Sequence, residues 1–179
     1  MSSLSLRIAN LFVMLLPCVG VCEAKDAWKT TSELAAPEAH QAAAADKRFV
    51  FAIASQHVAK YDRATGKRLA RSIGSAKHLN SGFLWRGRLL CAHSNYPQVP
   101  EQSEIKVLDP ESMRLTTFRD FGDFGGSLTW VVRHKGDWWC NFARYGDKNA
   151  ETVFVRFDDR WRETGRWTYP KSVIDQLGR

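Results

Sequence analysis

Polar and metal-capable side chains flank a short apolar run in the stretch "HLNSGFLWRGRLLCAHSNYP", residues 78–97. The stretch supplies His78 and Asn80 before the run, and His93 and Asn95 after it. Histidine nitrogens bind divalent metals or accept protons, and asparagine amides hydrogen-bond to ligands. We predict that these four side chains meet at one end of two neighbouring strands and contribute to a ligand-binding site.

An internal repeat, described below, adds two residues to this set. His40 aligns with Asn80 in the first repeat, and Arg144 follows a strand of the third. Histidines that converge on a channel mouth can bind a divalent metal, which lowers the pKa of a bound water, and an arginine can hold a carboxylate by two parallel bonds. The ligand-binding candidates are His40, His78, Asn80, His93, Asn95 and Arg144, with His40, His78 and His93 as the candidate metal ligands.

A structural role is the alternative for these side chains. Buried imidazoles and amides usually bond to backbone groups, and here such bonds would tie adjacent sheets together. For any single residue this is the simpler interpretation. Several such residues on loops of one rigid scaffold favour a ligand site, because binding sites concentrate there.

The repeat is visible in three segments, "KYDRATGKRL", "VLDPESMRL" and "RFDDRWRETGRW". Each has an alternating apolar strand that ends in Asp, followed by a turn and a second strand. The aspartates are Asp62, Asp109 and Asp158, which are 47 and 49 residues apart. A constant period of this length indicates a repeated supersecondary unit.

A second alignment supports the repeat and compares "AAADKRFVFAIAS", "FLWRGRLLCAHSN" and "VVRHKGDWWCNFAR". The residues that it makes equivalent are Phe49, Leu89 and Trp138. It also places Cys91 and Cys140 at the position of Phe51, on one pleat of corresponding strands. Equivalent positions on neighbouring repeats lie beyond the roughly 7 Å limit for a disulfide, so we predict two free, buried thiols.

Each repeat predicts four short strands separated by turn residues. Four-stranded antiparallel units that recur every 40 to 50 residues are typical of β-propeller blades. The predicted fold is all-β, with about three blades, at residues 40–73, 80–121 and 127–169. Closed propellers use about four to eight blades, so we expect an incomplete propeller: a fragment of a longer protein, or an assembly completed by self-association or a partner.

The two ends of the chain lie outside these repeats. Residues 1–24 read as a signal peptide, because Arg7 precedes the apolar run "IANLFVMLLPCVGV" and small residues follow it. The expected location is periplasmic or secreted, without a membrane segment after cleavage; an uncleaved anchor is the alternative. Residues 25–39 are expected to form an N-terminal segment or extra strand. Residues 170–179 are expected to connect blades, with Ser172 capping a short helical turn.

The chain carries a formal net charge of +7 at pH 7. Its basic residues gather around turns, as at Arg63, Lys67, Arg160 and Arg162, which is typical of a solvated face. No predicted helix carries a basic stripe, and no nucleic-acid motif occurs. We therefore expect no nucleic-acid partner.

The stretch from about Ala36 to Arg179 resembles exported bacterial propeller proteins that are loosely labelled cycloisomerase-like or lactonase-like. The resemblance lies in "HLNSG", "CAHSNYP", "FGGSLTW" and "WWCNFARYG". It implies a propeller fold, export, and lactone hydrolysis or cycloisomerisation. The candidate site adds a small anionic metabolite as the expected substrate, and its three histidines make a divalent metal the candidate cofactor. The resemblance assigns no catalytic residue. The alternatives are a non-catalytic propeller that binds a ligand or protein, and a truncated fragment without activity.

Overall fold

The computed structural model describes residues 29–177. The chain divides after Glu33, and every strand among the described residues lies in the unit that begins at Leu34. This unit contains three antiparallel sheets, two with four strands and one with five, and the strands follow chain order across each sheet. The predicted signal peptide, residues 1–24, lies outside the described residues.

The first sheet, blade 1, contains β1 (Ala42–Ala45), β2 (Phe49–Ile53), β3 (Val58–Asp62) and β4 (Arg68–Arg71). Blade 2 contains β5 (His78–Leu79), β6 (Phe83–Trp85), β7 (Arg88–Ser94), β8 (Ser103–Leu108) and β9 (Leu115–Gly122). Its innermost strand is split, because β5 and β6 both pair with β7. Blade 3 contains β10 (Ser127–His134), β11 (Asp137–Ala143), β12 (Val153–Phe157) and β13 (Glu163–Thr168).

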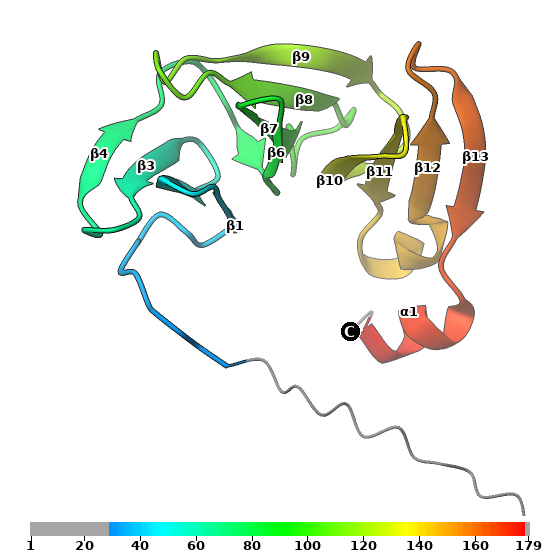
Figure 1. Cartoon of the computed structure of the whole chain (residues 1–179). Helices are drawn as coiled ribbons and strands as arrows, with labels where there is room; N and C mark the ends of the chain where they lie inside the picture. The colour runs from blue at the N-terminus through cyan, green and yellow to red at the C-terminus, as the bar shows by residue number, and fades with distance from the viewer. Residues whose placement is uncertain (1–28, 178–179) are drawn as a thin grey trace, which may run out of the picture. The chain divides into compact units, whose positions relative to one another are not determined.

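The described fold is therefore mostly β, with three blade-like sheets at the predicted repeats. The sheets lie side by side in Figure 1, with the last strand of each, β4, β9 or β13, at its outer edge. A 3₁₀ helix, η1 (Gly146–Glu151), connects β11 to β12, and the helix α1 (Lys171–Leu177) follows blade 3. No helix in residues 29–177 has the length and apolar character needed to cross a membrane.

The repeated aspartates fix the turn between the last two strands of each blade. Asp62 Oδ1 accepts the Thr65 N–H at 2.8 Å, and Asp109 Oδ1 accepts the Ser112 N–H at 2.9 Å. In blade 3, Asp158 Oδ1 accepts two backbone N–H groups of its own turn at 2.9 Å. These backbone hydrogen bonds favour the ionised form and lower the pKa of all three carboxyl groups. The repeat anchored on these residues is thus confirmed.

The second alignment is wrong by one residue in the first repeat. Ala52 pairs with the residue three before Asp62, just as Cys91 pairs with the residue three before Asp109. Ala52, not Phe51, is therefore equivalent to Cys91 and Cys140, and Val50, not Phe49, is equivalent to Leu89 and Trp138. Side chains alternate between the faces of a strand, so this offset assigns the first repeat's residues to the wrong face.

The same offset changes the equivalent of Asn80. The Asn80 N–H donates to the Ala92 carbonyl at 2.9 Å, and the Gln41 N–H donates to the Ile53 carbonyl at 3.0 Å. Ile53 and Ala92 are equivalent, since each directly follows an aligned residue on the second strand of its blade. Gln41, rather than His40, therefore corresponds to Asn80.

Neighbouring blades bury apolar side chains between them. The core between blades 1 and 2 includes Phe51, Ile53, Leu79 and Leu89, all fully buried. The core between blades 2 and 3 is aromatic, with Trp138 stacked on Trp161 at 4.8 Å between ring centroids and an interplanar angle of 13°. Tryptophan in this second core thus packs between blades, as the repeat predicts.

The two described cysteines are free and buried, as predicted. Cys91 lies in the core between blades 1 and 2, whereas Cys140 lies in the core between blades 2 and 3. Burial raises the pKa of Cys91 to about 12 and also raises the pKa of Cys140. Both side chains therefore remain protonated thiols at neutral pH.

An irregular segment, residues 34–39, covers part of blade 1. Residues 29–39 form no strand, so the extra strand expected there is not present in this range. Leu34 and Ala36 pack against Ala52, Ala59 and Tyr61 on the face of blade 1 that points away from blade 2. The segment thus supplies apolar cover where another blade would otherwise pack.

The carboxylate of Glu38 fixes this segment to the sheet. The Tyr61 hydroxyl donates to Oε2 of Glu38, and Arg68 Nη1 lies 2.7 Å from Oε1. The Tyr61 hydrogen bond is the main cause of a pKa of about 2 for Glu38, and the Arg68 guanidinium adds to it. The Tyr61 hydroxyl is the donor in this hydrogen bond, and the bond raises the pKa of Tyr61. The ionised carboxylate is therefore the form that holds the segment in place.

Pro170 precedes α1 directly. Its carbonyl accepts the N–H groups of Val173 and Ile174 at 2.9 and 3.2 Å. Ser172 is the second residue of the helix, so the prediction that it caps the helix is wrong. The proline itself stands at the capping position, since its ring is compatible with a helix start.

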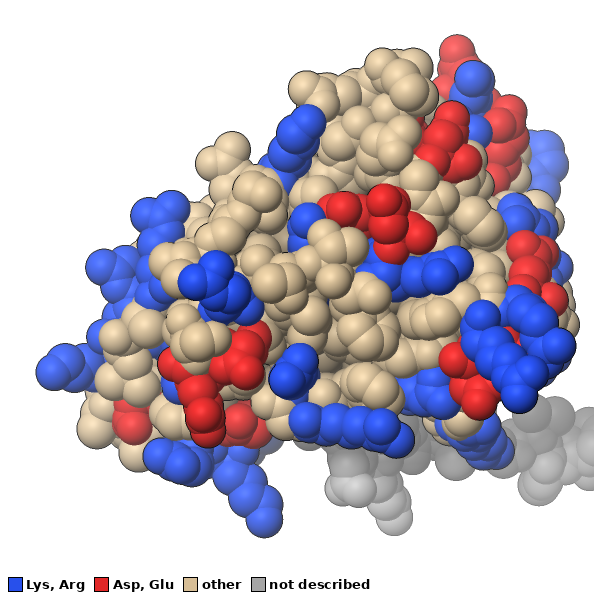
Figure 2. All heavy atoms as spheres, turned by 90° about the horizontal axis from the view of Figure 1, so that it is seen from above, with Lys and Arg blue, Asp and Glu red and all other residues tan. Residues whose placement is uncertain are grey.

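Charged side chains are mixed over the face that contains β9. Figure 2 shows Lys and Arg side chains beside acidic ones, separated by uncharged residues. Several basic residues of blade 3 and the segment after it form ion pairs at 2.7 Å: Arg162 with Asp158, Arg166 with Glu163 and Lys171 with Asp175. On this face the positive charge is therefore dispersed.

Replacing Tyr61 by Phe should loosen the Glu38 contact. The substitution leaves a buried carboxylate without one donor, so we expect the free energy of unfolding at pH 7 to fall by about 1–3 kcal/mol in urea denaturation. The folded-state pKa of Glu38 is depressed from 4.5 to about 2, so its stabilisation is present above pH 4.5 and is lost as pH falls toward 2. Tyr61→Phe should reduce this pH dependence. Tyr96→Phe, at a 40% exposed ring, is the control and should change stability by less than about 0.5 kcal/mol.

Thiol labelling tests the burial of the two cysteines. A charged disulfide reagent should modify Cys91 and Cys140 slowly in the native protein, because both are buried and protonated at pH 7.5. Both should react rapidly in urea. Peptide mass spectrometry separates their modification from that of the other two cysteines of the chain, Cys18 and Cys22. Rapid native labelling of Cys91 or Cys140 would contradict the packing between blades.

Candidate functional site

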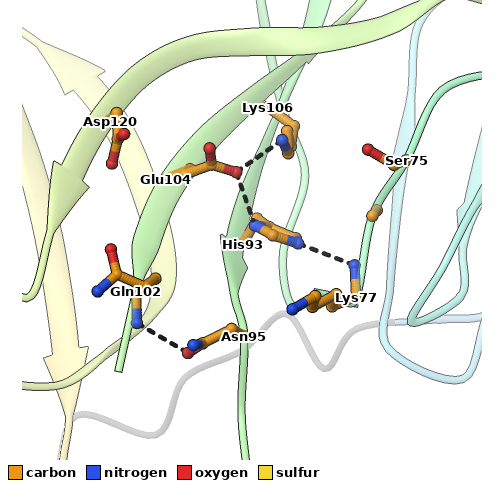
Figure 3. A pocket seen from close by; sticks show the side chains of 9 residues that line it. Ser75, Lys77, His93, Asn95, Gln102, Glu104, Lys106 and Asp120 are labelled. Atoms are coloured by element: carbon orange, nitrogen blue, oxygen red, sulfur yellow. Dashed lines mark hydrogen bonds and ion pairs between the residues drawn. The ribbon is translucent and has the colours of Figure 1, made fainter. Parts of the chain in front are cut away.

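A pocket of about 320 Å³ is lined by blade 2 and by the connection that precedes β5. The connection contributes its last three residues, and the rest come from the end of β7, from the start of β8 and its preceding loop, and from β9. Figure 3 shows the lining residues, which are Ser75, Ala76, Lys77, His93, Asn95, Gln102, Glu104, Lys106 and Asp120. Most of its lining residues are polar, and they carry charges of both signs.

Strand pairing places three of these side chains in one row. His93 of β7 is opposite Glu104 of β8, and Glu104 is opposite Asp120 of β9. Directly opposed residues on antiparallel strands lie on the same face and close enough to interact. Lys106 follows two residues after Glu104, so it points to the same face. The regular pleat of blade 2 thus builds one wall of the pocket.

Glu104 links a histidine and a lysine through one oxygen. Its Oε2 lies 2.6 Å from Lys106 Nζ and 3.1 Å from His93 Nδ1 (Figure 3). Lys106 also donates to the Thr117 hydroxyl at 3.0 Å. Lys106 is only 8% exposed, so its charge depends on Glu104 as a counterion. This chain of contacts fixes the side chains of the wall.

His93 is held as a neutral imidazole. Its Nε2 accepts the Lys77 N–H at 2.9 Å, so the ring proton is assigned to Nδ1, which faces Glu104. Burial is the main cause that lowers the pKa of His93 to about 4, and the nearby Lys106 charge adds to this effect. Nε2 is therefore hydrogen-bonded, whereas Nδ1 lies close to Glu104 Oε2 without a hydrogen bond of good geometry.

Two other charged groups of the pocket have only neutral partners. Lys77 Nζ donates to Gln98 Oε1 at 2.8 Å, and Asp120 Oδ1 accepts the Gly122 N–H at 2.8 Å. Within residues 29–177 neither has an oppositely charged side chain at ion-pair distance. Figure 3 places Lys77 and Asp120 on opposite sides of the His93–Glu104 pair. Among the described residues, the pocket thus offers a cation and an anion that have no ion-pair partner, on opposite sides of the His93–Glu104 pair.

Two of the predicted site residues, His93 and Asn95, line this pocket. Asn95 also closes the loop before β8, since its Oδ1 accepts the Gln102 N–H at 2.7 Å and its Nδ2 donates to the Pro100 carbonyl at 3.0 Å. Both residues therefore combine a structural role with a place at the pocket.

His78 lies at the same end of blade 2 but on its other face. It pairs with Ser94, whereas His93 pairs with Leu79, so the two rings project from opposite pleats. The His78 ring instead packs edge-on against Tyr96 at 5.5 Å, and Tyr96 contacts Tyr145 of the loop after β11 at 4.9 Å. His78 is thus outside the pocket.

The other predicted residues serve local structure. Asn80 Nδ2 donates to the Leu128 carbonyl at 2.8 Å, which ties blade 2 to blade 3. The Arg144 N–H donates to Thr152 Oγ1 at 3.0 Å, and Arg144 does not line this pocket. His40 lies in an exposed turn, with Nδ1 3.5 Å from the Pro37 carbonyl. For Asn80 the structural alternative is the correct one.

The predicted metal site of His40, His78 and His93 is wrong. In the part of the chain that the structure describes, no group of three or more His, Cys, Asp or Glu side chains is arranged to hold a metal ion. The physical reasons are the one-residue offset that brought His40 into the set and the opposite pleats of His78 and His93.

Sequence reasoning missed Lys77, Glu104, Lys106 and Asp120. A signal was available in "SEIKVL", where Glu104 and Lys106 alternate with apolar residues on the third strand of a repeat. A strand in that place has both faces covered, so charges with a period of two point to a paired polar wall. Lys77 carried no such signal, since it lies in an irregular connection.

A larger hollow of about 590 Å³ involves the first turns of blades 1 and 2. Two of its charged groups bond to local structure. Asp46 Oδ1 accepts the N–H groups of Arg48 and Phe49 at 2.7 Å, and Lys60 Nζ donates to the Pro110 carbonyl at 2.8 Å.

No protein-family model matches the chain, and no curated protein matches it. Among solved structures, the computationally designed Ika4 protein is similar over 80% of this chain and 100% of its own, with 12% identity and a TM-score of 0.47. The computationally designed Ika8 protein is similar over 71% of this chain, with 13% identity and a TM-score of 0.48. The chain spans 36% of the length of Ika8.

The buried neutral state of His93 predicts a pH dependence of stability. The unfolded histidine takes up a proton near pH 6.5 but the folded one only near pH 4, so the free energy of unfolding should fall as pH drops through this window. One such group contributes at most about 1.4 kcal/mol per pH unit. His93→Gln should flatten the dependence, as measured by urea denaturation between pH 7 and 4.5.

The test compares the pH dependence of the free energy of unfolding in wild type with that in His93→Gln. His57, whose pKa is also lowered by burial, contributes in the same window in both proteins. Parallel stability curves for the two proteins would show that His93 is not a buried neutral group.

Proposed function

We propose that the chain is an exported propeller-type protein whose pocket around His93 binds a small polar molecule with an anionic group. The observation that carries this proposal is the free charge of Lys77 at the pocket, opposite that of Asp120. An ammonium group without an acidic partner is available to a ligand carboxylate, whereas Lys106 is already neutralised by Glu104. The Glu104–Lys106 ion pair orders this wall of the pocket before a ligand binds. Binding therefore loses less free energy to the ordering of side chains.

Asp120 narrows the ligand class. Its carboxylate can accept hydrogen bonds from a hydroxyl or ammonium group at the other end of the ligand. A small hydroxy acid or amino acid carries both features, and its size suits a pocket of about 320 Å³. We therefore favour a compound with a carboxylate at one end and a hydrogen-bond donor at the other.

The same proposal treats the three sheets as blades of a propeller that further blades complete. Its support is the blade count, because closed propellers use about four to eight blades and residues 29–177 supply three. Those blades come from a longer protein or from a partner. The pocket is lined within blade 2 and its preceding connection, so its ligand site does not depend on how the propeller is completed.

Lactone hydrolysis or cycloisomerisation is the second candidate function, on the strength of the sequence resemblance. The histidine of the pocket is His93, and proton transfer to it as a base requires that the Lys77 amide first leave Nε2. Binding needs no such rearrangement and is therefore the function that the geometry supports better.

A thermal-shift and calorimetric screen tests the binding function. The probes are small hydroxy acids, amino acids and simple carboxylates, with their amides as uncharged analogues. We expect at least one acid to raise the melting temperature, because a ligand of the folded state stabilises it by about 2.7 kcal/mol at 100 times its Kd. Lys77→Gln should weaken this binding about tenfold or more. Lys67→Gln, at an exposed lysine in the turn after β3, should leave it unchanged.

Asp120→Asn tests the contact with the end of the ligand that carries the hydrogen-bond donor. The substitution should weaken the binding of acids that carry such a donor more than the binding of simple carboxylates. Equal binding by wild type and Lys77→Gln, or no binding of any acid in the panel, would contradict the proposal. A parallel lactone-hydrolysis assay with His93→Gln tests the second candidate: turnover that this variant abolishes, while its fold persists, would favour the enzyme.

A further inference from the structure

A hollow of about 190 Å³ lies at the end of blade 2 where a tight turn connects β6 to β7. Apolar side chains and two arginines form its lining, and among the described residues no acidic side chain contributes to it. The lining residues are Trp85, Leu90, Val107, Phe118, Arg86 and Arg88. We call this feature the arginine hollow.

The arginine hollow is separate from the pocket around His93. The two have no lining residue in common, and Arg88 and His93 lie about 16 Å apart along β7. Leu90 and Val107 belong to the core between blades 2 and 3, so a described sheet already covers this side of blade 2. A further blade would pack on the outward face of blade 1 or blade 3, away from the hollow. A ligand here therefore depends neither on the His93 pocket nor on further blades.

The apolar part of the hollow is aromatic and incompletely buried. Phe118 is 38% exposed, although its ring centroid lies 6.1 Å from that of Trp85 and 5.5 Å from that of Trp138. Trp85 and Trp138 are 5.1 Å apart. The interplanar angles of 57–66° are those of edge-on and tilted contacts, to which a further ring can add. A planar ring in the hollow would contact Trp85 and Phe118 and remove apolar surface from water.

The two arginines of the hollow have no acidic partner. Within residues 29–177 neither guanidinium has a carboxylate at ion-pair distance, and that of Arg86 lies over the Trp85 ring at 4.6 Å. Asp109 borders the neighbouring larger hollow together with both arginines, but its Oδ1 accepts two backbone N–H groups of its own turn at 2.9 and 3.0 Å. The guanidinium groups thus retain donors for charge-assisted hydrogen bonds to an anion.

Two more arginines surround the same group of rings. The Arg133 guanidinium lies 4.8 Å from the ring centroid of Trp138 and 5.8 Å from that of Trp85. The Arg119 guanidinium lies 5.4 Å from the Trp161 ring, and its buried Nε has no hydrogen-bond partner in the described part of the chain. Neither arginine forms an ion pair there. This concentration of positive charge favours an anionic ring over a neutral one.

We infer that the arginine hollow binds a small aromatic acid, whose ring contacts Trp85 and Phe118 and whose carboxylate meets Arg86 and Arg88. The volume of about 190 Å³ suits a single ring, since a cavity of about 150 Å³ can hold benzene. The ring and the anionic group are both needed, because the hollow offers apolar contact and positive charge side by side. A ligand of this size should bind with a dissociation constant on the order of 0.1–1 mM.

Calorimetry and ligand-observed NMR with the full chain test this site. The probe is benzoate, with benzamide as the ring without a charge and acetate as the charge without a ring. Benzoate should bind at least about tenfold more tightly than either analogue, because each lacks one of the two contacts. The titrations are repeated in Lys77→Gln, which removes the unpaired cation of the His93 pocket. Benzoate binding to the arginine hollow should be the same in this variant as in wild type.

Substitutions in the hollow separate the two contacts. Arg86→Gln and Arg88→Gln should each weaken benzoate binding about tenfold, because a charge-assisted contact is lost. Phe118→Leu should weaken it about threefold, because it removes a ring contact but keeps an apolar side chain. Lys135→Gln is the matched control for Arg86→Gln: Lys135 has the same position in the tight turn of blade 3 and the same φ of 50°, but does not line the hollow.

Circular dichroism checks the fold of each variant, and the two exposed arginines keep the test valid if Phe118→Leu does not fold. The inference is overturned if wild type binds no benzoate at about 10 mM, or binds benzamide equally well. It is also overturned if Lys135→Gln weakens binding as much as Arg86→Gln does. Benzoate binding that Lys77→Gln abolishes, and that both arginine variants leave intact, would belong to the His93 pocket and likewise overturn it. Benzoate binding that only the hollow variants weaken would support it, whether or not any hydroxy acid or amino acid binds near His93.

Discussion

A four-stranded sheet has two faces, and in this protein the need to cover both governs the arrangement of every blade. Blade 2 is the only described sheet with another sheet on each side, and its strands carry the fully buried Leu79, Leu90, Ile105 and Leu108. On blade 1, an irregular segment covers the second face. Leu34 and Ala36 of this segment pack on the sheet, and Glu38 accepts a hydrogen bond from Tyr61. Blade 3 leaves its second face to water, and the rings there pack against one another instead.

The ligand pocket follows from the same constraint. A middle blade excludes water from both pleats, so the charges of Glu104 and Lys106 can stand there only as a pair with further hydrogen bonds. Low solvation keeps His93 neutral, and the Lys77 N–H, which donates to Nε2, fixes its tautomer. The contacts of Glu104 hold the wall together, and the two charges without an ion-pair partner, Lys77 and Asp120, lie on either side of the His93–Glu104 pair.

The sequence predicted the blades well because their turns depend on local chemistry. Asp62, Asp109 and Asp158 each cap the turn that follows, so the period and the strand boundaries were visible without tertiary information. Which face a side chain occupies depends instead on strand register, and a slip of one residue put His40 in the place of Gln41. The pocket itself depends on contacts between distant segments, such as the Lys77 amide with His93, that no local pattern encodes. His93 and Asn95 were found because strand ends are predictable, whereas Lys77 and Asp120 required the fold.

The segment that covers blade 1 is synthesised before that blade, because it precedes the blade in the chain. During synthesis the amino-terminal parts of a protein emerge and fold first, and exposed sheet faces invite aggregation while they wait for partners. Leu34, Ala36 and Glu38 leave the ribosome ahead of the strands that they cover. The first blade can therefore shield its outward face as soon as β3 and β4 are formed, so only the face that awaits blade 2 is at risk in the nascent chain.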